Sequence, residues 1–167
     1  DVYKRQRGLG DVYKRQLHMN RNIYLNLDVK FYMNKYQQLI DFLPPLSNFR
    51  NDTSGTITSY RINQPQIENT ERPALVFLHG FNGSSKSWAY QFAYFTSQTV
   101  VAIDAPGFGE SQPVDGGMVA IADEVAALIA SLVTGKVVII GHSMGGMLAQ
   151  VLGATHPDIC QAIILSC

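Results

Sequence analysis

The stretch that decides the fold reads KVVIIGHSMGGMLAQVLGAT and covers residues 136–155. It opens with an apolar, β-branched run over residues 136–140, which is typical of a strand buried on both faces. The pentapeptide GHSMG follows at residues 141–145 and leads directly into a pattern with apolar residues at helical spacing. A serine between two glycines, at the point where a strand turns into a helix, is the arrangement of a nucleophile elbow.

This pentapeptide predicts the position of a reactive serine. A side chain at Gly141 or Gly145 would strike neighbouring backbone in so sharp a turn. The turn lifts the Ser143 hydroxyl clear of the sheet, and the first turn of the helix offers free N–H groups to a developing negative charge. We therefore predict Ser143 as the nucleophile and the main-chain N–H of Met144 as one oxyanion donor. His142 is interpreted as an orienting or packing neighbour.

A second glycine-containing loop, HGFNGSS at residues 79–85, follows the apolar run Ala74–Leu78. An oxyanion hole in this arrangement needs a further N–H from the loop after that strand. We predict that the Phe81 main chain supplies it, which leaves the Phe81 side chain free to line the acyl pocket. His79 and Gly80 are expected to shape the loop.

The remaining pattern predicts an α/β fold with a mostly parallel sheet and helices on both faces. Four short apolar runs read as buried strands, and helical patterns separate them. In such sheets the sites lie at the carboxyl ends of the strands, where both loops above begin. A third loop, DAPGFGES at residues 104–111, is expected to shape the pocket rim. The predicted strands are 56–62, 74–78, 99–103, 136–140 and 162–165, and the predicted helices are 85–95, 118–133 and 144–155.

The amino-acid composition gives no indication of a nucleic-acid partner or of a membrane span. Thirteen basic and thirteen acidic residues cancel, which gives no electrostatic footprint for nucleic acid or an anionic membrane. Apolar residues make up 46% of the chain, enough for a core, but no run reaches the roughly 18 residues of a membrane span. Cys160 and Cys167 match no metal or redox spacing. We expect a cytoplasmic protein with a small-molecule substrate; nothing in the sequence indicates an oligomeric state.

The N-terminal residues fall outside this pattern. The hexamer DVYKRQ occurs at residues 1–6 and again, unchanged, at residues 11–16. It matches the translation of a sequencing-library adapter, so we interpret residues 1–16 as foreign to the fold. Residues 17–55 form a leader with a possible true start at Met33, and residues 56–167 form the first part of the α/β domain.

The three loop motifs HGFNGSSKSW, DAPGFGES and GHSMGGMLAQ together resemble those of the α/β-hydrolase superfamily. The closest resemblance is to its group of single-domain esterases, enol-lactonases, carbon–carbon bond hydrolases, cofactor-free haloperoxidases and proline iminopeptidases. It covers residues 57–167 and implies a serine hydrolase that acts on an ester, lactone or related acyl compound without a metal or organic cofactor. Serine at position 143 also implies a difference from haloalkane dehalogenases and epoxide hydrolases, whose elbow carries aspartate.

The rest of a catalytic triad is expected to lie C-terminal to this chain. Triad order in this fold is serine, acid, histidine, and the residues after Ser143 include one histidine, His156, and one acid, Asp158. His156 lies 13 residues further along the helix, roughly 20 Å from the serine. The chain thus reads as C-terminally truncated and inactive alone. Two alternatives stay open: carbon–carbon bond hydrolysis or cofactor-free peroxidation on the same scaffold, and a non-catalytic small-molecule binder.

Overall fold

The computed structural model describes residues 34–65 and 72–166. It divides into two compact units, residues 1–41 and residues 42–167. In the first unit the described residues, 34–41, are helical. The adapter-like repeat and the proposed start at Met33 lie outside the described residues. Within the described part, no helix has the length and apolar character that crossing a membrane requires.

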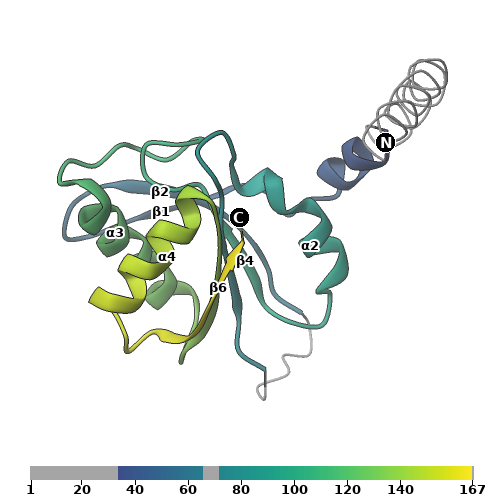
Figure 1. The fold of residues 1–167 in the computed structure, drawn as a ribbon. Coiled ribbons are helices and arrows are strands. Elements are labelled where there is room, and N and C mark those ends of the chain that lie inside the picture. Colours follow the sequence, from purple (N-terminus) through teal and green to yellow (C-terminus); the bar gives the residue numbers. More distant parts are fainter. Residues whose placement is uncertain (1–33, 66–71, 167) are drawn as a thin grey trace, which may run out of the picture. The chain divides into compact units, whose positions relative to one another are not determined.

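The second unit alternates strands and helices, as the sequence predicts (Figure 1). Helix α4 has the predicted bounds, whereas the segment predicted as one helix over 85–95 begins as a 3₁₀ turn, η1, and continues as α2. The elements in chain order are β1 (Ser47–Arg50), β2 (Ile57–Asn63), β3 (Leu75–Leu78), η1 (Ser85–Trp88), α2 (Ala89–Tyr94), β4 (Val100–Ile103), α3 (Gly117–Leu132), β5 (Val137–His142), α4 (Met144–Thr155) and β6 (Cys160–Ser166).

The strands form one mostly parallel sheet in the order β1-β2-β4-β3-β5-β6. Strands β4, β3, β5 and β6 pair in parallel, and β2 joins β4 and β1 in antiparallel pairing. The sequence does not predict strand β1, because its residues Ser-Asn-Phe-Arg include no β-branched side chain. Strand β1 pairs with β2 across the turn at residues 51–56, so the sheet extends N-terminal to residue 56.

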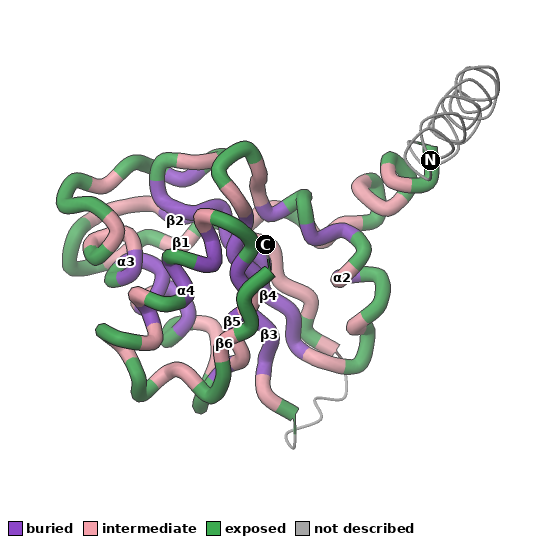
Figure 2. Tube along the Cα trace, in the orientation of Figure 1, coloured by how far each residue is buried: buried purple, intermediate pink, exposed green. Residues whose placement is uncertain are grey.

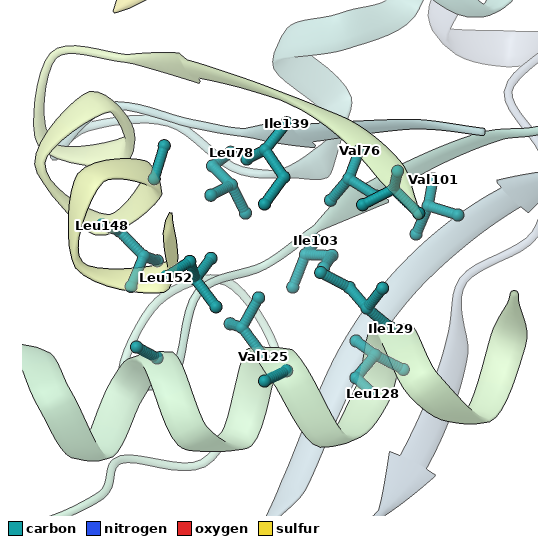
Figure 3. Close-up of a cluster of buried hydrophobic side chains, with 14 of the residues drawn as sticks. Val76, Leu78, Val101, Ile103, Val125, Leu128, Ile129, Ile139, Leu148 and Leu152 are labelled. Atoms are coloured by element: carbon teal, nitrogen blue, oxygen red, sulfur yellow. The ribbon is translucent and has the colours of Figure 1, made fainter. Parts of the chain in front are cut away.

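Helices cover both faces of the sheet, as predicted, and each face has its own core. Figure 1 shows α3 and α4 on one side and α2 on the other. Val76 and Leu78 of β3 point into the core beneath α3 and α4 (Figure 3). Their neighbours Leu75 and Phe77 point the opposite way, toward Trp88 in the core beneath η1 and α2. Each buried side chain of this size stabilises the fold by about 1.5–3 kcal/mol.

Strand β6 differs from the prediction that its apolar run is buried on both faces. Ile164 is 52% exposed and Leu165 is 51% exposed, and most of β6 is drawn as exposed or intermediate in Figure 2. The reason is its place in the sheet, because β6 pairs with β5 alone and is the last strand of the described order. The apolar run of β6 therefore predicts correctly that this segment is a strand, but it does not predict how far the strand is buried.

Candidate active site

Ser143 occupies a strained bend between β5 and α4. Its φ of 52° and ψ of −116° set it apart, since it alone among the described non-glycine residues has a positive φ. Such a conformation costs about 1–3 kcal/mol and persists where surrounding structure enforces it. Here strand β5 ends at His142 and helix α4 begins at Met144. The chain thus changes direction at one residue, which is the sharp turn that the pentapeptide predicts.

The two flanking glycines are sterically required. A Cβ atom built on Gly141 would lie 2.2 Å from the Gly145 carbonyl oxygen. One built on Gly145 would lie 2.1 Å from the Leu78 carbonyl oxygen, at the end of β3. Because both obstacles are backbone atoms, neither position accommodates a side chain without moving an element. The absence of side chains lets the first turn of α4 pack directly against the end of β3.

The loop after β3 passes beside Ser143. A Cβ atom built on Gly80 would lie 3.4 Å from Ser143 Cβ and 2.9 Å from His142 Nδ1. The Phe81 side chain projects outward and is 69% exposed. The structure therefore brings together the two segments that the sequence analysis assigned to one site.

These residues line a single open cavity of about 560 Å³. Ser143 and His142 contribute from the bend, and the loop after β3 contributes most of the opposite wall. Met144 does not line the cavity; its side chain packs against the core beneath α3 and α4. Three lining residues were missed by the sequence analysis, because their positions depend on packing between distant elements: Ser87, Trp88 and Ser166.

The two predicted oxyanion donors are free. Within the described part of the chain, neither the Phe81 N–H nor the Met144 N–H donates a hydrogen bond to a protein acceptor. By contrast, the Ser143 N–H donates to the Ser166 carbonyl at 3.0 Å, and the Ser143 carbonyl accepts from the Gly146 N–H at 2.8 Å. Both N–H groups are therefore left to donate to water or to a bound ligand.

Asp104, which follows β4, holds the loop 104–111 in place through hydrogen bonds. Its buried carboxylate accepts the Ser85 N–H at 2.5 Å through Oδ1 and the Glu110 N–H at 3.2 Å through Oδ2. The Ser111 hydroxyl also donates to the Asp104 carbonyl at 2.6 Å. The loop 104–111 thus holds the start of η1, whose residues 87 and 88 line the cavity.

We expect Asp104→Ala to lower the free energy of unfolding by about 3 kcal/mol, because the buried Ser85 N–H loses a charged acceptor and the Glu110 N–H loses the same carboxylate. Urea denaturation of the two proteins measures this difference. Asp115→Ala is the matched control, since Asp115 is exposed on the following loop, and its change is expected to stay within about 0.5 kcal/mol. Equal stability of the two variants would contradict the structural role of Asp104.

His79 lies next to the cavity, whereas His156 lies away from it. His79 is 1% exposed beneath the loop after β3, and its two ring nitrogens contact the Gly80 carbonyl and the Ala105 N–H. His156 ends α4, does not line the cavity, and pairs through Nε2 with the Asp123 carboxylate of α3 at 2.9 Å. Among the described residues, no group of three or more His, Cys, Asp or Glu is placed to hold a metal ion.

Comparison with known proteins finds relatives along the C-terminal part of the chain. The chain is 36% identical over 89 residues to 2-succinyl-6-hydroxy-2,4-cyclohexadiene-1-carboxylate synthase of Enterobacter sp., covering 51% of this chain and 33% of the relative. It is 32% identical over 99 residues to human epoxide hydrolase 4, covering 56% and 27%. Among solved structures, a thermophilic esterase from Thermogutta terrifontis is 28% identical with a TM-score of 0.61, covering 72% and 44%.

The chain spans about a third of the length of the curated relatives that it matches. A family model described as the alpha/beta hydrolase fold matches residues 73–167, more than half of the chain. The matched region contains β3, β4, β5 and β6 of the parallel block, together with the loop after β3, the loop 104–111 and the bend at Ser143. The chain therefore belongs to the α/β-hydrolase fold family.

Proposed function

We propose that the complete protein is a serine hydrolase that cleaves an ester, a lactone or a related acyl compound. One observation supports this most strongly: Ser143 sits at a strained bend beside a cavity that the Gly80–Phe81 loop also lines. Among the described residues, the N–H of Met144, which follows Ser143 in the chain, and the N–H of Phe81 in that loop have no protein acceptor. Strained residues cluster at functional sites, and free main-chain donors around a nucleophile suit a reaction that creates a negative oxygen.

The proposed reaction proceeds in two steps. The Ser143 hydroxyl attacks the acyl carbonyl while a base removes its proton, and the resulting oxyanion is held by the Phe81 and Met144 N–H groups. The alcohol leaves with a proton, and water then attacks the acyl-serine to release the acid. Each oxyanion donor is expected to contribute about 3–4 kcal/mol to the chemical step.

The base and the acid of the triad are assigned to parts of the complete protein outside the described residues. His79 has both ring nitrogens occupied, and His156 is paired with Asp123 away from the cavity. A serine hydroxyl without a base is a weak nucleophile. We therefore expect residues 42–167 alone to hydrolyse esters at no more than the residual rate that an oxyanion hole provides.

Hydrolysis of p-nitrophenyl butyrate by the complete protein tests the proposal. Turnover at a steady rate, preceded by a burst of p-nitrophenol equal to the enzyme concentration, supports an acyl-enzyme route. Saturable binding of the ester without turnover would instead favour a non-catalytic binder. Cleavage of a β-diketone in place of the ester would favour carbon–carbon bond hydrolysis on the same scaffold.

The Phe81 side chain is expected to set the preference for acyl length. Its ring lines the cavity and packs edge-on against Phe108 with ring centroids 5.5 Å apart. Phe81→Ala is expected to raise KM for an octanoyl ester by about 10-fold, since apolar contact with the chain is lost, while kcat changes little. The N–H donor at position 81 is retained in this variant.

Steady-state kinetics on acetyl and octanoyl p-nitrophenyl esters measure the effect. The matched control is Tyr94→Ala, which removes an exposed aromatic side chain of α2 that does not line the cavity. An equal change of KM for both esters, or the same change in Tyr94→Ala, would contradict a role of Phe81 in acyl binding.

A further inference from the structure

We propose that His79 is a positioning residue that fixes the direction of the Phe81 N–H by holding the Gly80 carbonyl. The inference rests on the proposed function, because it explains how one of the two oxyanion donors is aimed. His79 itself does not touch the substrate. It is 1% exposed and lies beneath the loop that it holds.

The hydrogen bonds determine the tautomer of His79. The Ala105 N–H lies 3.1 Å from Nε2, so Nε2 must accept and carries no proton. The Gly80 carbonyl lies 2.7 Å from Nδ1 and offers only lone pairs, so Nδ1 must donate. His79 is therefore a neutral imidazole protonated on Nδ1. It cannot serve as the base for Ser143, because neither nitrogen is available.

Because the peptide bond is planar, the fixed direction of the Gly80 carbonyl also fixes the direction of the Phe81 N–H. The Gly80 carbonyl and the Phe81 N–H belong to one peptide unit, and the described residues contain no cis peptide bond. In a trans peptide these two groups point in opposite directions in one plane. The carbonyl is held twice, by His79 Nδ1 and by the Gly83 N–H at 2.9 Å. The N–H of Phe81 must therefore point away from His79 and Gly83, and no acceptor for it lies among the described residues.

His79 is in turn held by the loop after β4. The Ala105 N–H fixes the far side of its ring, and the Phe108 ring packs edge-on against it with centroids 5.6 Å apart. Asp104, the neighbour of Ala105, is anchored by the hydrogen bonds described above. The loop 104–111 thus supports the oxyanion loop through one histidine, and the geometry of the site depends on two loops rather than one.

Two isosteric replacements separate this role from simple packing. The amide nitrogen of asparagine reaches the place of Nδ1, so His79→Asn keeps the donor to Gly80 and loses the acceptor for Ala105. The amide of glutamine reaches the place of Nε2, so His79→Gln keeps the acceptor and loses the donor. In the complete protein we expect His79→Gln to lower kcat by about 100-fold with KM nearly unchanged. His79→Asn is expected to stay within about 10-fold of wild type.

Thermal unfolding of both variants accompanies the kinetics, because a packing role would destabilise the variants without making kcat depend on which ring nitrogen is replaced. Equal kcat values for the two variants, or full activity of His79→Gln, would overturn the inference. If His79→Gln does not fold, a two-bond ¹H–¹⁵N correlation spectrum of the wild-type protein decides: a proton on Nδ1 supports the inference, and a proton on Nε2 refutes it.

The same experiments distinguish this inference from the proposed function. If the wild-type complete protein neither hydrolyses p-nitrophenyl butyrate nor reacts with a fluorophosphonate, the proposed function fails. If the wild type does both and His79→Gln matches it in kcat, only the positioning role of His79 fails.

Discussion

Replacing Ser143 with alanine in the complete protein is expected to lower kcat for p-nitrophenyl butyrate by about 10⁶-fold, because loss of the nucleophile of a triad costs about as much as loss of the whole triad. The fold should survive, since Ser143 is fixed through its main chain, with its N–H donating to Ser166 and its carbonyl accepting from Gly146. Steady-state kinetics and thermal unfolding of the same preparations measure the two quantities together.

Ser166→Ala is the matched control for this experiment. Ser166 lines the same cavity and contacts Ser143 through its main-chain carbonyl, which alanine retains. We expect its kcat to stay within about threefold of wild type, in keeping with a group that makes no bond to the reacting atoms. If Ser143→Ala keeps more than about a hundredth of the wild-type kcat, another residue is the nucleophile.

Replacing Gly145 with alanine is expected to lower the free energy of unfolding by roughly 3 kcal/mol or more and to abolish turnover, because overpacking against immobile atoms costs at the upper end of the usual range. The added Cβ would lie 2.1 Å from the Leu78 carbonyl oxygen and 2.7 Å from the His79 carbonyl oxygen. Relief requires α4 to move away from β3, and that movement displaces Ser143 from the Gly80–Phe81 loop.

Gly153→Ala tests whether the effect is specific to the bend. Gly153 lies in the same helix, but its added Cβ would meet only the flexible end of the Ile163 side chain, at 2.4 Å to Cδ1. Alanine also favours the helix by about 1 kcal/mol over glycine. Urea denaturation should therefore show a much smaller change for Gly153→Ala. A similar loss in both variants would mean that α4 does not depend on contact with β3 at Gly145.

Local signals in the sequence were sufficient for the elements that surround Ser143. Helix α4 has its predicted bounds because its start is fixed by the elbow and its end by His156-Pro157. The steric requirement at Gly141 and Gly145 also follows from the pentapeptide, since the obstacle at each position is backbone. Sequence motifs thus predict the local backbone geometry well where the constraint is local.

Contacts between distant segments could not be predicted in the same way. The residues of β1 have little intrinsic preference for a strand, and β1 forms through its antiparallel pairing with β2. The apolar run of β6 does not reveal that β6 is the last strand of the sheet. The two hydrogen bonds of His79 join residues 79, 80 and 105, and the sequence alone does not reveal that residue 105 lies close to the loop after β3.

Reaction of the complete protein with a fluorophosphonate, followed by peptide mapping in a mass spectrometer, tests most directly whether Ser143 is the activated nucleophile that we propose. We expect one phosphonate per molecule, attached to Ser143, with no adduct in the Ser143→Ala variant. An adduct on any other residue, or an unlabelled Ser143 in protein that still hydrolyses the ester, would contradict it.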